Sequence, residues 1–374
     1  MTTTKNNEYK KLNFSNEQEQ SQACLNSAEH EKNQGRKVLN VPNLRFPEFQ
    51  GKWEESKLGD VATSISSGKS KASCGNYNLY GSTGVIGKTC EAFYEGQMLL
   101  IARVGANAGK LQIINEKCGI TDNTLIVKTE RIPATYIYYY LQHFNLNRLI
   151  FGSGQPLITG GMLKKVMIPL GNDAEQNKIT NLLSLIDVHI ATQSKVINRL
   201  QSLIIGIANK SFHVARETKP LLEFAPNITS GNDKNGSGTI PLYGSTGIIG
   251  MVKNASQKGN IVLVARVGTI GTVQFVNEPC GVSDNALIIK AGDMTKYIYY
   301  FLKTYNFARI TSGTTQPLIT ASSLKKIAVP IFDIERSSNI VRCLSGLEKK
   351  LNIEKRYLLD MVMIKQYLLR QMFI

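Results

Sequence analysis

The sequence predicts an α+β protein built from two tandem mixed α/β domains, each followed by a long helix. Three observations lead to this prediction: the chain contains two copies of one pattern, apolar runs separated by glycines fill each copy, and a long helical pattern follows each copy. The offset between the copies is 163 residues at the start and 161 at the end. A period of this length exceeds that of a solenoid unit, so each copy should fold as a domain.

Six pairs of matching segments define the duplication. They are "YGSTGVIG" at 80 and "YGSTGIIG" at 243, "LIARVG" at 100 and "LVARVG" at 263, "NEKCGITDN" at 115 and "NEPCGVSDN" at 277, "YIYYYL" at 136 and "YIYYFL" at 297, "QPLIT" at 155 and 316, and "LKKVMIP" at 163 and "LKKIAVP" at 324. Every feature of one domain can therefore be compared with its counterpart in the other.

Inside each copy, apolar runs of strand length alternate with glycine-containing segments. "MLLIARV", "TLIV" and "VMIPL" predict strands in the first copy, and "IVLVARV", "ALII" and "IAVPI" predict them in the second. The segment 133–151 predicts a helix, because Pro133 suits a first helical position and apolar residues recur three to four residues apart. Its tyrosines are interpreted as the packed face of a core helix, with base stacking as the less favoured alternative.

Long helices are predicted after both globules, because apolar residues recur in steps of four and three. The first pattern runs through Ile179, Leu183, Ile186, Ile190, Gln193, Ile197, Leu200, Ile204 and Ile207. The second runs through Ile340, Leu344, Leu347, Leu351, Glu354, Leu358, Met361, Lys365 and Leu368. Such spacing is typical of coiled coils, so the two helices should pair with each other. The polar residue at the fifth place of both patterns either specifies register or occurs by chance.

The charge balance favours a polyanionic partner. The chain has 44 basic and 28 acidic residues, a net charge of +16 and a pI near 9.5. Nucleic acid is preferred over a membrane surface, because the basic residues form no polybasic block and no basic amphipathic helix. With no run of eighteen apolar residues and no secretory signal pattern, the sequence predicts a cytoplasmic protein.

The cysteines and the glycine-rich segment at 80–89 predict no metal or nucleotide site. The six cysteines lack the spacing of a zinc site or a disulfide framework, and they are Cys24, Cys74, Cys90, Cys118, Cys280 and Cys343. "YGSTGVIGKT" is similar to a P-loop, but the position five residues before Gly87 holds Ser82 where glycine is required. The second copy replaces the lysine and threonine with Met251 and Val252, which argues against a nucleotide-hydrolysing enzyme.

The order of globule, long helix, globule and long helix closely resembles the specificity subunit of type I restriction-modification systems. The resemblance rests on "NLRFPEFQGKWEESKLGDV", "YGSTGVIG", "LIARVGANAG", "QPLITGGMLKKVMIP" and "EQNKITNLLSLID", and it extends from about residue 41 to Ile374. The resemblance accordingly implies a disordered tail at 1–40 and two target recognition domains at 41–170 and 214–331. The helices are expected at 171–213 and 332–374.

The resemblance implies that each globule reads half of a bipartite site in double-stranded DNA. It also implies that the helices form an antiparallel coiled coil with a pseudo-twofold arrangement of the halves, which sets half-site spacing and docks modification (methyltransferase) subunits. Restriction subunits would join outside these. S-adenosylmethionine, ATP and magnesium would bind to the partners and no cofactor to this chain, which is expected to be non-catalytic and not membrane-bound. An autonomous double-stranded DNA-binding or scaffold protein is the alternative.

Candidate DNA contacts occur in both copies at matching places. In the first copy they are Tyr80, Ser82, Thr83, Arg103, Asn123, Gln155, Lys164 and Lys165, and in the second Tyr243, Ser245, Thr246, Arg266, Asn285, Gln316, Lys325 and Lys326. Arginine can bind guanine or phosphate, asparagine can pair with adenine, and lysine and hydroxyl groups can meet phosphates.

Each candidate has a structural alternative. The arginines could form internal ion pairs with Asp122 and Asp284, and the Asp-Asn steps are common turn chemistry. The lysines could be solvated strand flanks, and the "YGST" segments could be glycine turns supported by a packed tyrosine. Because the copies share so many loop residues, we predict two similar half-sites and a nearly palindromic, interrupted target.

Overall fold

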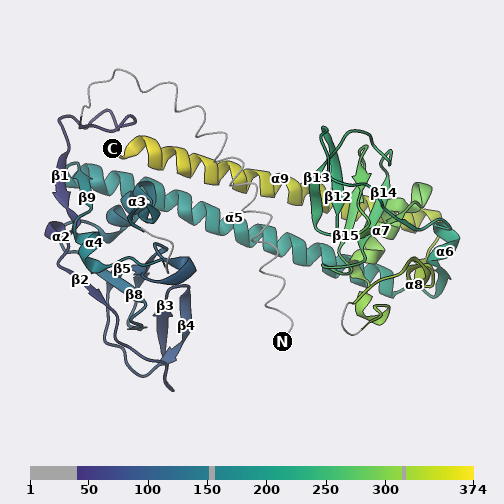
Figure 1. Cartoon of the computed structure of the whole chain (residues 1–374), viewed down its shortest axis with the longest axis horizontal. Coiled ribbons are helices and arrows are strands. Elements are labelled where there is room, and N and C mark those ends of the chain that lie inside the picture. The colour runs from purple at the N-terminus through teal and green to yellow at the C-terminus, as the bar shows by residue number, and fades with distance from the viewer. Residues whose placement is uncertain (1–39, 151–155, 314–316) are drawn as a thin grey trace. The chain divides into compact units, whose positions relative to one another are not determined.

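The computed structural model of the chain describes residues 40–150, 156–313 and 317–374. One compact unit consists of the described residues up to Ser184 together with Lys365–Ile374, and the other of those in Leu185–Ile364. Each long helix contributes residues to both units (Figure 1). The predicted tail lies outside the described residues except for Asn40, and so do Gln155 and Gln316. No helix in the described part of the chain is long and apolar enough to cross a membrane.

The first unit contains three small sheets. They are β1 (Glu54–Lys57) with β9 (Met167–Leu170), a four-stranded sheet in the order β2 (Ser64–Ser67), β8 (Thr124–Lys128), β5 (Gln97–Ala102) and β6 (Leu111–Asn115), and a three-stranded sheet of β4 (Gly84–Thr89), β3 (Tyr77–Gly81) and β7 (Gly119–Ile120). Its short helices are α2 (Leu58–Val61), α3 (Ala134–Phe144) and α4 (Gly160–Lys164), with 3-10 turns at Gly105–Asn107 and Leu146–Leu149. All pairings are antiparallel except that of β3 with β7.

The second unit repeats this order of strands and α-helices, whereas one of its two 3-10 turns lies at a different place. Its sheets are β10 (Glu217–Pro220) with β18 (Ala328–Ile331), the four strands β11 (Thr229–Ser230), β17 (Ala286–Ile289), β14 (Ile261–Ala265) and β15 (Val273–Val276), and the three strands β13 (Gly247–Val252), β12 (Ile240–Gly244) and β16 (Gly281–Val282). Its helices are α6 (Leu221–Phe224), α7 (Thr295–Thr304) and α8 (Ala321–Lys325), with 3-10 turns at Gly292–Met294 and Phe307–Arg309.

The apolar runs become the central strands of the four-stranded sheets. Along β5, Leu99 and Ile101 pack into the core that includes α3, whereas Met98 and Leu100 pack into a smaller core beside β7. Both faces of the strand are therefore buried, which explains why the sequence shows a continuous apolar run instead of an alternating one. In the second unit the residues of β14 divide between two cores in the same way.

The helix predicted over 133–151 is interrupted. The α-helix ends at Phe144, and Asn145 adopts a left-handed conformation with φ of 57°. The Asn145 side chain then accepts a hydrogen bond from the Asn147 backbone N–H at the start of the 3-10 turn, so a local polar contact outcompetes the continued helix. The tyrosine stripe packs as predicted, because Tyr136, Tyr139 and Tyr140 are buried and the Tyr136 hydroxyl donates to the Pro169 carbonyl at 2.8 Å.

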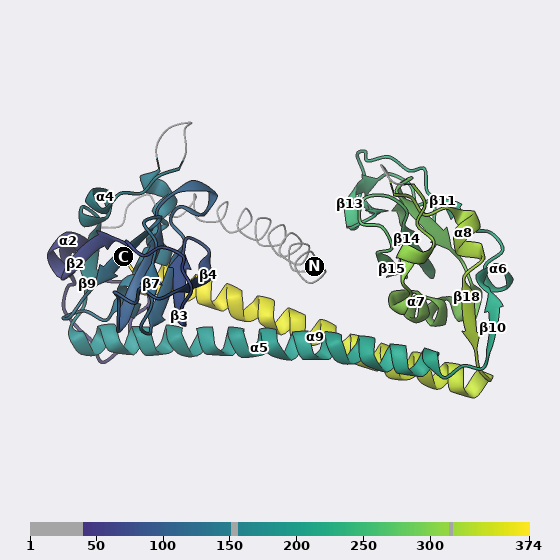
Figure 2. The same cartoon turned by 90° about the horizontal axis from the view of Figure 1, so that it is seen from below.

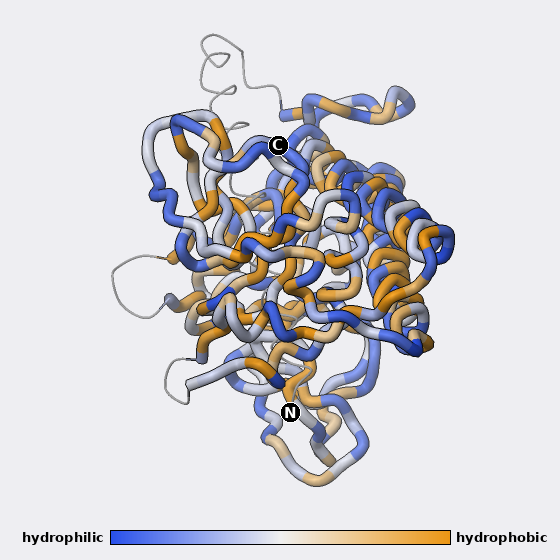
Figure 3. The backbone as a smooth tube through the Cα atoms, turned by 90° about the vertical axis from the view of Figure 1, so that its right-hand side faces the viewer, coloured by the Kyte–Doolittle hydropathy of each residue, from blue (hydrophilic) through white to orange (hydrophobic). Residues whose placement is uncertain are grey.

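Both long helices form as single helices. They are α5 (Asp173–His213) and α9 (Ile334–Met372), and equivalent residues cap them: Asn172 Oδ1 accepts from Glu175 N–H at 2.8 Å, and Asp333 Oδ1 accepts from Arg336 N–H at 2.7 Å. Within the second unit, residues 185–213 of α5 run antiparallel beside α9 (Figures 1 and 2). Hydrophobic and hydrophilic residues alternate along these helices (Figure 3).

The two polar positions of the apolar seam meet each other. Gln193 Nε2 donates to Glu354 Oε2 at 2.5 Å and to the Glu354 backbone carbonyl at 3.1 Å. The apolar neighbours in the seam, such as Ile197 and Leu351, are buried on either side. A shifted register would leave both polar groups facing apolar residues, so this pair favours the observed register.

The stability of the first unit is expected to fall in mildly acidic solution. His143 packs against the ring of Phe373, with ring centroids 6.0 Å apart. Burial lowers the pKa of His143 below its ordinary value of 6.5, and the nearby Arg148 adds to this effect. Because the unfolded chain then binds the proton more readily, the unit should be fully stable above about pH 6.5 and should lose stability as the pH falls through the lowered pKa.

Urea unfolding of the whole chain at several values between about pH 7.5 and 5 measures this dependence. The variant His143→Phe keeps an aromatic ring against Phe373 and removes the titrating group. It should unfold at a midpoint that depends less on pH than that of the wild type. Equal pH dependence in the two proteins would show that other groups control the acid transition.

Candidate nucleic-acid interface

The segment that resembles a P-loop forms a β-hairpin. Strands β3 and β4 pair antiparallel, Ser82 and Thr83 form the connecting turn, and Gly84 follows with φ of 115°. In the second unit Ser245 and Thr246 occupy the same turn, and Gly247 has φ of 126°. A P-loop connects a strand to a helix, whereas a second strand follows here. The positive φ angles explain why glycine closes both turns.

The hairpin tyrosines are held by carboxylates. The Tyr80 hydroxyl donates to Glu116, which also accepts from Asn78 Nδ2 at 3.1 Å, and the Tyr243 hydroxyl donates to Glu278 at 2.6 Å. Burial and Glu116 together raise the pKa of Tyr80 to about 12, and the hydrogen bonds from Tyr80 and Asn78 lower the pKa of Glu116. The tyrosines therefore support the hairpins from inside, and the side chains of the turn residues lie at the tip.

Backbone hydrogen bonds gather several candidate segments of the first unit beside this hairpin. Thr121 N–H donates to the Tyr80 carbonyl at 2.9 Å, and Arg103 N–H donates to the Asn123 carbonyl at 3.0 Å. Ile158 N–H donates to the Arg103 carbonyl at 2.9 Å, so the chain that follows Gln155 returns to this place. The hairpin, the arginine and the Asp-Asn turn therefore belong to one surface.

The second unit repeats these bonds. Ser283 N–H donates to the Tyr243 carbonyl at 2.9 Å, and Arg266 N–H donates to the Asn285 carbonyl at 3.0 Å. The Thr269 hydroxyl adds a bond to the Ser245 carbonyl at 3.0 Å, which ties the loop after Arg266 to the hairpin turn. The same backbone frame thus presents the same residue types in both units.

The two arginines have the most informative environment. Among the described residues, neither Arg103 nor Arg266 forms an ion pair, and the Nε atoms of both are buried without a hydrogen-bond partner. The alternative of internal ion pairs with Asp122 and Asp284 is therefore not observed. A buried unsatisfied donor is costly, and this one occurs at the same place in both units.

The other candidates divide into two groups. Asn123 and Asn285 lie exposed in tight turns, in which Thr124 N–H donates to the Thr121 carbonyl at 3.2 Å and Ala286 N–H donates to the Ser283 carbonyl at 3.3 Å. The lysine pairs lie at the ends of α4 and α8, with Lys164 and Lys325 as the last helical residues and Lys165 and Lys326 as the C-caps.

Solvated strand flanks were the alternative to phosphate contacts for the lysine pairs, and each pair closes a short helix before the strand begins. The side chain of Lys164 packs close to Gly59 of α2, where an added Cβ would lie 2.9 Å from Lys164 Cβ. No contact described here brings these lysines to the hairpin. Thr159 and Thr320 cap the two short helices through their hydroxyl groups, which is why helix forms at this point.

Two duplicated features of this surface were missed by the sequence reasoning. One is the carboxylate pair Glu116 and Glu278, and the other is the pair of buried hydroxyls of Thr121 and Ser283, which lack hydrogen-bond partners among the described residues. Both lie in the matched segments "NEKCGITDN" and "NEPCGVSDN", so the duplication itself was the signal.

These features define a class of protein with two copies of one α/β domain and a pair of long helices. The family model for the type I restriction modification DNA specificity domain matches residues 50–202 and 218–360. The chain therefore belongs to this family, the specificity subunits of type I restriction-modification systems, and it carries the domain twice.

Known proteins agree with this assignment. A putative type I restriction enzyme specificity subunit of Haemophilus influenzae is 26% identical over 143 residues, which cover 35% of this chain and 37% of that protein. The crystal structure of a type I restriction-modification S subunit from M. genitalium has a TM-score of 0.67 at 18% identity, covering 89% of this chain and 99% of that one. A chain from a structural study of type I system assembly and conformational transition has a TM-score of 0.52 at 12% identity, covering 85% and 96%. The structural likenesses concern the fold.

Proposed function

We propose that this chain is the non-catalytic subunit that selects the DNA sequence for a type I restriction-modification complex. Each unit would read one half of a bipartite site through the surface formed by the hairpin, the arginine and the Asp-Asn turn. The observation that carries the proposal is the pair of arginines, Arg103 and Arg266, whose Nε atoms are buried without partners among the described residues in two equivalent frames. A guanine edge or a phosphate offers acceptors that suit an arginine side chain.

The charge of the chain supports the same conclusion. A net charge of +16 attracts the DNA backbone and makes binding dependent on salt. Non-specific attraction of this kind would position the chain, while the duplicated loops would supply the sequence preference. A cytoplasmic location, where the DNA and the partner subunits meet, is part of the proposal.

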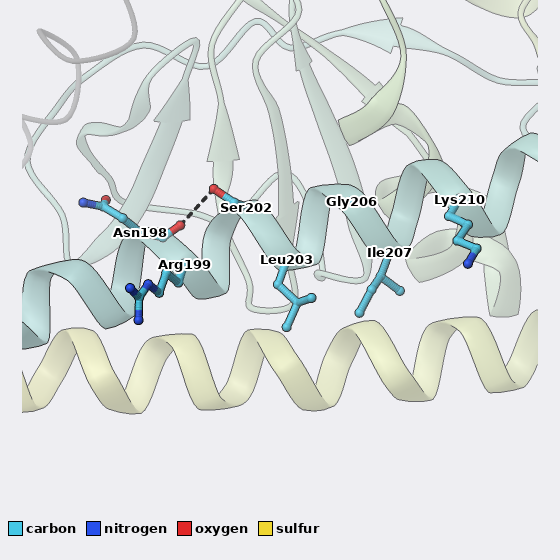
Figure 4. A pocket seen from close by; sticks show the side chains of 7 residues that line it. All are labelled: Asn198, Arg199, Ser202, Leu203, Gly206, Ile207 and Lys210. Atoms are coloured by element: carbon cyan, nitrogen blue, oxygen red, sulfur yellow. Dashed lines mark hydrogen bonds between the residues drawn. The ribbon is translucent and has the colours of Figure 1, made fainter.

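The long helices offer a surface for protein partners. Exposed apolar residues in the second unit include Leu185, Val188, Leu203, Ile205, Ile353 and Ile364. An open groove with a volume of about 600 Å³ lies along α5 near Leu203 and Ile207, with Arg199 and Lys210 at its margins (Figure 4). Exposed apolar patches on a helix are typical of protein interfaces, so we propose that methyltransferase subunits dock here.

A division of labour between subunits is part of the same proposal. Methyltransferase and restriction subunits would bind S-adenosylmethionine, ATP and magnesium, and this chain would bind DNA and the methyltransferase subunits. The helix pair would fix the spacing between half-sites, with the contact between Gln193 and Glu354 holding its register. An autonomous DNA-binding or scaffold protein is the alternative function.

The test is to express the chain with its methyltransferase subunits and to sequence the methylated DNA at single-molecule resolution. We expect co-purification of the subunits and one methylated motif with two similar half-sites separated by a fixed spacer. DNA binding by the chain alone without methyltransferase association would favour the autonomous alternative. Two unrelated half-sites would show that the shared loop residues do not set the sequence preference.

A further inference from the structure

Both hairpins expose two consecutive apolar side chains. Val85 is 53% exposed and Ile86 is 52% exposed, and the equivalent Ile248 and Ile249 are 57% and 45% exposed. In a regular strand, successive side chains point to opposite faces, so two adjacent exposed β-branched residues raise the question of local geometry. The same pattern occurs in both units.

A β-bulge produces this arrangement. Tyr80 pairs with Val85 and Leu79 pairs with Gly87, so Ile86 is an extra residue on β4. In the second hairpin Tyr243 pairs with Ile248 and Leu242 pairs with Gly250, which leaves Ile249 as the extra residue. Bulges redirect side chains and are frequent beside functional sites.

A glycine on the opposite strand makes room for each bulged isoleucine. A Cβ added at Gly81 would lie 2.9 Å from Ile86 Cδ1, and one added at Gly244 would lie 2.8 Å from Ile249 Cδ1. The bulge and its glycine are retained in both copies, although Lys88, two residues after the bulged isoleucine, has Met251 as its counterpart. The exposed pair is therefore a built feature that the chain contains twice.

The exposed apolar pair lies on the same hairpin as the turn that contains the candidate DNA contacts. In the second unit, Gln274 Nε2 donates to the Gly244 carbonyl at 2.9 Å, and the Thr269 hydroxyl donates to the Ser245 carbonyl at 3.0 Å. Thr269 follows Arg266 by three residues, so the hairpin is continuous with the surface that carries this arginine. A ligand that binds at Arg266 would therefore also lie near the bulge of the second hairpin.

We propose that the bulges contact thymine methyl groups in the major groove, with Val85 and Ile86 acting at one half-site and Ile248 and Ile249 at the other. This inference rests on the proposed function and names residues that would determine sequence preference. The major groove is about 12 Å wide and admits a two-stranded β-ribbon. The thymine C5-methyl is the apolar group displayed on its floor, and apolar side chains recognise it.

The test uses the complex with its methyltransferase subunits and a duplex containing the mapped target. Each thymine is replaced in turn by deoxyuridine, which removes only the methyl group. The double variants Val85→Ser with Ile86→Ser, and Ile248→Ser with Ile249→Ser, remove the apolar methyl groups and leave small hydroxyl side chains. Ile334→Ser, at a position 90% exposed at the start of α9, is the matched control.

We expect the wild type to lose roughly fourfold in affinity when the contacted thymine of either half-site loses its methyl group. Each hairpin variant should bind the thymine duplex more weakly and should no longer distinguish uracil from thymine in its own half-site. Its discrimination in the other half-site should be unchanged, which shows that the variant is folded. The control should behave as the wild type does.

Two results would overturn the inference while leaving the proposed function intact. One is a wild-type complex that selects its target but is indifferent to every thymine methyl group. The other is a pair of hairpin variants that retain thymine discrimination and instead lose the methyltransferase subunits, which would make the bulge a protein contact. A complex with no sequence preference at all would remove the proposed function and this inference together.

Discussion

Replacing Arg103 with alanine is expected to abolish the preference for one half-site, and replacing Arg266 is expected to abolish it for the other. Because a bidentate arginine contact contributes about 1–3 kcal/mol of discrimination, each variant complex should bind its target roughly 10- to 100-fold more weakly. Lysine at the same position keeps the charge but lacks the planar fork, so it should restore only part of the affinity. Binding titrations with the mapped target and with targets altered in one half-site measure the effect.

The stability of the free protein separates this role from a structural one. The Nε atoms of both arginines have no hydrogen-bond partner in the described part of the chain, so replacing either arginine should leave the free energy of unfolding nearly unchanged. Arg131→Ala removes the same charge from an exposed position of the first unit and is the matched control. A variant at Arg103 that unfolds more easily and yet retains half-site preference would contradict the assignment.

Replacing Glu175 with alanine is expected to destabilise the first unit by about 3–5 kcal/mol. Its carboxylate is fully buried and accepts hydrogen bonds from Arg45 Nε at 2.7 Å, from Arg45 Nη2 at 2.8 Å and from Trp53 Nε1 at 3.1 Å. The Arg45 side chain is only 15% exposed, so the variant leaves a largely buried cation that keeps only the backbone carbonyls of Gln50 and Gly51 as acceptors. It also removes the carboxylate that accepts from the Trp53 indole N–H. Urea unfolding of the whole chain provides the measurement.

An exposed ion pair on the same helix supplies the comparison. Lys178 pairs with Glu48, and the two side chains are 47% and 46% exposed. Lys178→Gln should therefore cost less than about 1 kcal/mol. Similar losses in the two variants would mean that the Glu175 cluster contributes no more than a surface ion pair. The second unit carries Arg336 at the position equivalent to Glu175, so its transition should change little in either variant.

Much of the fold could be predicted from the sequence, because its strongest signals are periodic. Steps of four and three residues identified the long helices and their seam, and Leu183 and Leu344 are fully buried in it. The apolar run around Leu100 identified a central strand. The end of the helix before Asn145 was not predicted, because the apolar spacing continues past this residue. The spacing gives no sign that the Asn145 side chain caps the 3-10 turn that follows.

The candidate surface was predicted only in part. Arg103 and Arg266 were chosen because they follow an apolar strand, but the absence of an aspartate partner among the described residues depends on three-dimensional position. The lysine pairs were chosen from charge alone, and the structure places them at the ends of short helices. The exposed bulges were overlooked because two adjacent apolar residues in a strand are normally interpreted as buried.

The sequence by itself determined that this chain contains one domain twice, that two amphipathic helices follow the domains, and that its charge suits DNA. These properties follow from the repeats, the periodicity and the composition of the sequence alone. Only the tertiary structure decided which side chains lack partners and which face outward. Those properties depend on the register between strands, where one extra residue in β4 or β13 turns an isoleucine from the core toward the solvent.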